Sequence, residues 1–80
     1  MKSSYYRLYI FDRAGRAIQS FDMIAATLGM AALRARRAAL AIENSASFEL
    51  WQAAPPILNR KERRWLLALK EAAREQQRVA

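Results

Sequence analysis

The side chains that could support catalysis are few and almost all of one kind. The 80-residue chain contains neither cysteine nor histidine, which excludes disulfides, thiolate chemistry and zinc sites built from Cys and His. Seven carboxylates remain as candidate acids or bases: Asp12, Asp22, Glu43, Glu49, Glu62, Glu71 and Glu75. Asp12 suits a turn, and Asp22 and Glu62 suit helix starts, so structural roles account for these residues.

The remaining patterns that could bind a metal or a phosphate group are weak. Glu71 and Glu75 lie one turn apart on a predicted helix and could share a cation, but such pairs are far commoner on solvated faces. Gly15 and Gly29 are the only glycines, so there is no glycine-rich phosphate loop. The sequence therefore predicts a protein that is not an enzyme, with no catalytic residue, metal, cofactor or small-molecule substrate.

Positive charge is the strongest compositional feature. The net charge is +7 and the isoelectric point is about 10.9, which favours anionic partners such as nucleic acid, although solubility is a simpler explanation. The densest cluster stands beside Trp65 and consists of Arg60, Lys61, Arg63 and Arg64. Cations at a helix N-terminus oppose the helix dipole, and this local cost indicates a use beyond stability. The cluster is therefore a candidate nucleic-acid-binding site, where the cations would contact phosphates. The alternative is a solvated helix face with Trp65 in the core.

The chain is predicted to be organised around a strand at residues 5–12, which is rich in aromatic and β-branched residues. Its alternation predicts a core face made of Tyr6, Leu8 and Ile10. The other face carries Tyr5, Arg7, Tyr9 and Phe11. Exposed aromatics beside a cation could stack bases, together with Trp51, but the favoured expectation is that a second helix covers this face.

A turn and a long helix are predicted to follow. Asp12 and Gly15 predict a hairpin turn with a glycine bulge, leading to an edge strand at 16–21. Asp22 is the expected N-cap of a helix at about 23–43. Gly29 weakens that helix and marks either a kink or a later start.

Two apolar stripes run along this predicted helix. One, which should face the sheet, comprises Ile24, Leu28, Ala31, Ala35 and Ile42. The other comprises Leu33 and Leu40, flanked by Met30, and needs a cover from the C-terminal helix or from another subunit. Arg34, Arg36 and Arg37 spread around the helix, as the rim of such a surface would.

The rest of the chain completes an expected α+β domain spanning 1–80. A short strand at 48–52 should place Phe48 and Leu50 in the core, with Trp51 outward. A right-handed crossover would make it parallel to the second strand, giving a three-stranded sheet of order 2-1-3 within a β-β-α-β core at 5–52. A Pro-containing linker at 53–59 and a basic helix at 60–78 follow.

Three sequence motifs within residues 5–52, and the spacing between them, resemble those of other small proteins. The stretches are Tyr6-Arg7-Leu8-Tyr9-Ile10-Phe11-Asp12, Gly15-Arg16-Ala17-Ile18 and Glu49-Leu50-Trp51-Gln52. This order resembles small uncharacterised bacterial proteins with a tyrosine-rich N-terminal hairpin and a Glu-Leu-Trp strand. The resemblance supports the β-β-α-β core and implies no activity. This chain departs from them in lacking an acidic cluster at the helix start and in adding a basic helix after Pro56.

The sequence thus predicts an interaction protein. No secretion-signal pattern and no membrane span are evident, so a cytoplasmic location is expected. The main hypothesis is a module that binds a protein partner or self-associates, as a homo-oligomer, through Met30, Leu33, Leu40 and Trp51. The alternative is a basic accessory protein that binds nucleic acid through its C-terminal helix.

Overall fold

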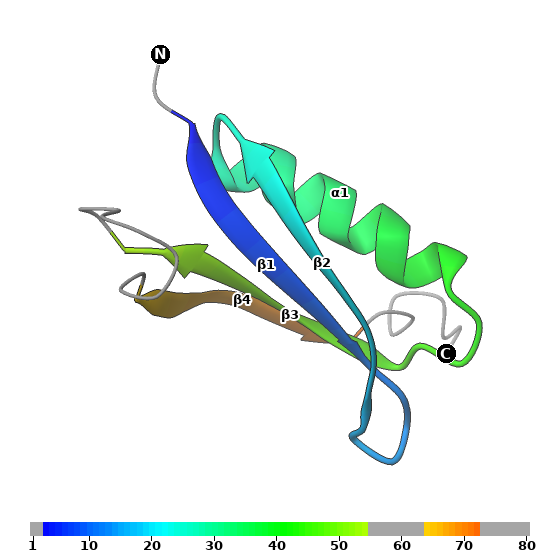
Figure 1. The fold of residues 1–80 in the computed structure, drawn as a ribbon. Coiled ribbons are helices and arrows are strands. Elements are labelled where there is room, and N and C mark those ends of the chain that lie inside the picture. Colours follow the sequence, from blue (N-terminus) through cyan, green and yellow to red (C-terminus); the bar gives the residue numbers. More distant parts are fainter. Residues whose placement is uncertain (1–2, 55–63, 73–80) are drawn as a thin grey trace.

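A four-stranded antiparallel sheet carries a single helix on one face in the computed structural model, which describes residues 3–54 and 64–72 (Figure 1). The elements are β1 (Ser4–Phe11), β2 (Ala17–Ala25), α1 (Leu28–Ala41), β3 (Ser47–Ala53) and β4 (Trp65–Ala72). The strand order is β2-β1-β3-β4. The α+β class and the 2-1-3 order of the first three strands are confirmed. Because β2 and β3 both pair antiparallel with β1, they run parallel to each other, also as predicted.

The core joins the inner face of the sheet to a row of alanines on the helix. The largest fully buried side chains are Tyr6, Leu8, Ile10, Phe48 and Leu50. Strands β1 and β3 therefore turn their predicted faces towards the core. On the helix, the buried residues are Ala31, Ala32, Ala35 and Ala39. The sheet supplies the bulk of the core and the helix supplies a smooth surface that can approach it closely.

The β1–β2 turn follows the predicted chemistry. Gly15 has a φ of 82°, a conformation that glycine adopts without a Cβ penalty. The Gly15 amide donates to the carbonyl oxygen of Asp12 at 3.0 Å, and the Asp12 amide donates to that of Arg16 at 2.9 Å. The Asp12 carboxylate also accepts from the Arg16 amide at 3.0 Å.

The predicted start of the helix is wrong, and the ladder with β1 explains why. Asp22 does not cap a helix; it lies in β2, opposite Arg7. The true N-cap is Thr27, whose hydroxyl accepts from the Met30 amide at 3.1 Å. The helix spans 14 residues and begins just before Gly29, which agrees with the later start considered from the sequence.

The first predicted stripe is wrong at its first two members for the same reason, and its later members are confirmed. Ile24 belongs to β2 and is 52% exposed, and Leu28 opens the helix at 41% exposed. Ala31 and Ala35 are fully buried as expected, and Ile42 packs partly against the core. Five residues of the predicted helix therefore pair with β1 or connect to α1 instead.

The predicted C-terminal helix is also wrong over the described residues, because 65–72 form strand β4. The strand pairs along the free edge of β3, with Leu69 opposite Leu50. A short apolar run satisfies helical and strand patterns about equally, and an open edge decides between them by offering a complete row of hydrogen bonds. The predicted helix start at Glu62 and the residues after Ala72 lie outside the described residues.

Candidate functional site

The sheet presents one face to α1 and the other away from it, and among the described residues α1 is the only helix (Figure 1). We call this other side the open face. Its side chains are identified by the strand register, because directly opposed residues share a face. Its aromatic and aliphatic members are Tyr5, Tyr9, Phe11, Ile24, Trp51, Trp65 and Leu67.

Arg7 lies at the centre of the open face and links three strands. Its Nε is 2.8 Å from Asp22 Oδ1 and its terminal nitrogen is 3.1 Å from Oδ2, a two-pronged ion pair. Its guanidinium carbon also lies 4.5 Å from the centroid of the Trp65 ring, within cation–π range. The hydrogen bonds that Arg7 donates to Asp22 raise the pKa of Arg7 above its ordinary value. The guanidinium is therefore always charged, but that charge is already paired.

A second ion pair stands on β3 and β4. Glu49 accepts a hydrogen bond from the Trp51 indole nitrogen at 3.1 Å, and its other oxygen lies 3.9 Å from the Lys70 ammonium. The positive charges of Arg7 and Lys70 are thus matched by Asp22 and Glu49. Among the described residues the open face has no excess charge, although the whole chain carries +7.

Apolar surface remains accessible around this balanced centre. Tyr5 is 38% exposed, Leu67 is 49% exposed and Ile24 is 52% exposed. Four strands about 4.8 Å apart and about 8 residues long give a footprint of roughly 500 Å². A shallow hollow of about 430 Å³ lies over Arg7 and Tyr9, towards β2. An accessible sheet face of this area, with apolar side chains around paired charges, is a candidate interaction site.

The structure divides the predicted protein-interaction residues between two surfaces. Trp51 lies on the open face, outward as expected. Met30, Leu33 and Leu40 lie on α1, on the other side of the molecule, and are 46%, 47% and 40% exposed. They do not form one site.

The predicted base-stacking residues are brought together, and within residues 3–54 and 64–72 no helix covers them. Tyr5, Arg7, Tyr9 and Trp51 share the open face. Residues 65–72 do not lie over them as a helix, because β4 extends the sheet sideways. Trp65 therefore belongs to the open face and not to the core. Sequence reasoning missed Asp22, Trp65 and Leu67, since their place depends on pairing between distant strands.

The predicted basic cluster is described only at its last member. Arg60, Lys61 and Arg63 lie outside the described residues. Arg64 is exposed just before β4, and its carbonyl oxygen accepts from the Ala54 amide at 2.7 Å. Arg64 is not part of a helix, because the next residue begins strand β4. It therefore cannot share a helical face with the other three cations.

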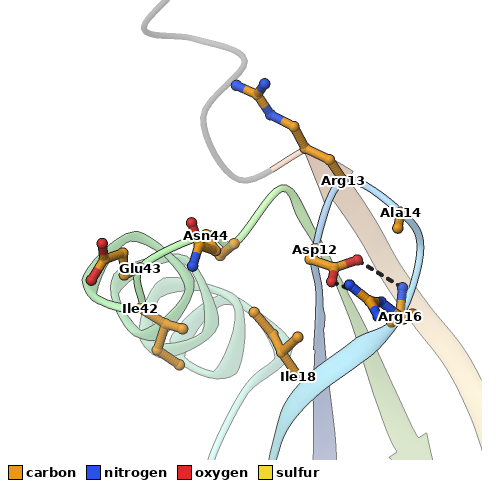
Figure 2. Close-up of a pocket in the computed structure, with 9 residues that line it drawn as sticks. Asp12, Arg13, Ala14, Arg16, Ile18, Ile42, Glu43 and Asn44 are labelled. Atoms are coloured by element: carbon orange, nitrogen blue, oxygen red, sulfur yellow. Dashed lines mark hydrogen bonds and ion pairs between the residues drawn. The ribbon is translucent and has the colours of Figure 1, made fainter.

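A separate groove of about 990 Å³ lies between the hairpin turn and the end of α1 (Figure 2). Ile18 lies between these two elements, Ile42 lies at the end of α1, and Asp12 bonds Arg16 on the hairpin side (Figure 2). The Arg16 amide lowers the pKa of Asp12, so this carboxylate stays ionised and serves the turn. The Ser45 hydroxyl is buried and donates to the Ala39 carbonyl oxygen. Neither group is arranged as a nucleophile or base.

Further observations bear on metals and membranes. Within residues 3–54 and 64–72, no three acidic side chains gather where they could hold a metal ion. The one described helix, α1, is too short to cross a bilayer.

Comparison with known proteins returned no match to any family model, curated protein or solved structure. The resemblance to bacterial proteins with a tyrosine-rich hairpin stays a prediction.

Proposed function

We propose that the protein is a small non-enzymatic interaction module that self-associates by stacking the open faces of two copies. The observation that carries the proposal is the open face itself, where aromatic and aliphatic side chains surround ion pairs that are already satisfied. The predicted cytoplasmic location is part of this proposal.

Charge balance favours a second copy as the occupant. Two proteins of net charge +7 repel each other unless their contact surfaces are locally neutral. The pairs Arg7–Asp22 and Glu49–Lys70 provide such a surface, and they can be buried without leaving a lone charge. Stacked sheets lie about 10 Å apart, which allows the aromatic side chains of the two copies to interdigitate.

The size of the face sets the expected strength. Two footprints of roughly 500 Å² bury roughly 1,000 Å² in total, at the low end of specific interfaces. A weak dimer is expected, with a dissociation constant in the micromolar range or above. Its population should depend strongly on protein concentration.

Sedimentation velocity with two matched variants tests the proposal. Leu67→Lys places a cation on the open face, and Leu33→Lys places one on the helix at almost the same exposure, 49% against 47%. Between about 5 µM and about 500 µM, the native protein and Leu33→Lys should shift from monomer to dimer, and Leu67→Lys should remain monomeric. A native protein that stays monomeric throughout this range, or a Leu67→Lys variant that dimerises like the native protein, would refute the proposal.

A second candidate function is binding of single-stranded nucleic acid to the same face. It is favoured by the aromatic side chains on the two central strands, Tyr5 and Tyr9 on β1 and Trp51 on β3, because bases stack on such platforms. The balanced charges make it the weaker candidate, since phosphate contacts need unpaired cations. Arg60, Lys61, Arg63 and Arg64 are the proposed source of those cations.

Fluorescence anisotropy with a labelled oligonucleotide separates the two candidates. Nucleic-acid binding predicts affinity that falls steeply between low and physiological salt and is lost in Tyr9→Ala. Absence of binding at low salt would eliminate the second candidate and leave self-association untouched.

A further inference from the structure

The solvent side of α1 carries a second surface, which we call the outer seam: Met30, Leu33, Arg37 and Leu40. These four positions are spaced by three, four and three residues. This is the a–d–a–d spacing by which one helix packs against another. At 100° per residue they lie opposite the buried alanines Ala31, Ala35 and Ala39. The seam therefore points away from the sheet.

All charged residues of α1 are positive. Its sequence contains Arg34, Arg36 and Arg37 and no acidic residue. Arg36 is bound to Glu71 on β4 by two hydrogen bonds of 3.0 and 2.7 Å. Arg34 donates to the main-chain carbonyl oxygen of Ile24 at 2.9 Å. Within the described residues, Arg37 has no carboxylate partner, and it occupies one of the four seam positions.

These charges decide which occupant the seam can take. In a parallel pairing of two copies, Arg37 would meet Arg37; in an antiparallel pairing it would meet Leu33. Either arrangement brings two Arg34 and two Arg37 side chains together without a carboxylate, which is repulsive. A helix with apolar residues at its own seam and a Glu or Asp opposite Arg37 would satisfy both features.

We propose that the outer seam of α1 docks an acidic amphipathic helix of a different protein. The seam and the open face lie on opposite sides of the molecule, so the proposal is independent of self-association. In a dimer stacked through the open faces, two seams would point outward in opposite directions. Each protomer would then present one site to a partner helix.

The test uses two synthetic helical peptides that differ only in charge. Both carry Leu at the flanking seam positions; one has Glu at the central position and its neighbours, and the other has Lys. Anisotropy of labelled peptide is measured with the full chain at about 50 mM and about 150 mM salt. Native protein should bind the Glu peptide at least about tenfold more tightly than the Lys peptide.

Variants then connect the preference to the seam. Arg37→Glu should reverse the preference, so that the Lys peptide binds more tightly. Leu33→Ser, which removes an apolar contact without adding a charge, should weaken binding of the Glu peptide at least about tenfold. Arg13→Glu, a charge change at the exposed hairpin tip, should leave the preference intact. Circular dichroism confirms that each variant is folded.

Three outcomes would overturn the proposal. The first is absence of binding by either peptide, and the second is a preference that Arg37→Glu does not change. The third is loss of self-association in Leu33→Lys, which would assign the seam to a second copy. That last outcome can be told apart from failure of the open-face proposal, in which Leu67→Lys would have no effect on self-association.

Discussion

The close contact between α1 and the sheet predicts a large penalty for one added side chain. Ala35 is fully buried at the middle of the helix, against a sheet surface that is also fully buried. Replacing it with Leu adds three carbon atoms where no space is left, and overpacking of this kind costs roughly 1–3 kcal/mol. For a domain of this size each kcal/mol lowers Tm by about 4–8 °C, so Ala35→Leu should lower Tm by about 4–24 °C.

The matched control is Ala41→Leu, at an exposed position on the same helix. Alanine and leucine have similar helix propensities, so this variant should stay within about 0.5 kcal/mol of the native protein. Thermal unfolding is followed by circular dichroism at one low protein concentration, because self-association would raise Tm with concentration. Equal Tm values for Ala35→Leu and Ala41→Leu would refute the close approach of helix and sheet.

Other predictions concern glycines and one ion pair. Gly29→Ala should stabilise the protein by about 0.4–1 kcal/mol, because the new Cβ would meet only a side-chain oxygen at 3.8 Å. Gly15→Ala should destabilise it by about 1–2 kcal/mol, since Gly15 has a φ of +82°. Urea unfolding measures the free energy of unfolding of both variants, and a change opposite to the predicted one would contradict the prediction for that glycine. Arg36 lowers the pKa of Glu71, so their pair stabilises the fold above the unfolded Glu pKa of about 4.3 and loses this contribution as pH falls through the lowered folded value. The stability gap between native protein and Arg36→Gln should therefore shrink from about pH 7 to about pH 3, and a constant gap would contradict the assignment.

Local patterns were sufficient for β1, for β3 and for the first part of β2. The alternation of Tyr6, Leu8 and Ile10 identifies a strand and its buried face, and Phe48 and Leu50 do the same for β3. The turn glycine identifies the hairpin. With β3 parallel to β2 and β1 between them, the order is 2-1-3.

Strand β4 was missed because a bulge hides its alternation. Leu67 faces the open side before the register shift, and Lys70 faces it afterwards, with Ala68 left unpaired between them. The period of two is therefore broken in the middle of the run, and the helical spacing of Trp65 and Leu69 is the clearer local signal.

The helix start was missed because its competitor is distant in sequence. Asp22 is a good N-cap by type, but Arg7 binds it across the β1–β2 ladder, fifteen residues away. The same non-local pairing builds the centre of the open face. The contact between Arg7 and Trp65 exists only once β4 has joined the sheet, so local spacing could indicate the members of the site but not their arrangement.

The central claim is that two copies stack through their open faces, and the most direct test is a distance between protomers. Because the chain has no cysteine, single spin labels can be attached at Ser20→Cys on the open side of β2 or at Arg37→Cys on α1. With sheets about 10 Å apart and helices about 10 Å thick on the outside, pulsed electron spin resonance should give Ser20 labels within roughly 25 Å and Arg37 labels beyond roughly 30 Å. The reverse order, with the Arg37 labels closer together, would contradict stacking through the open face.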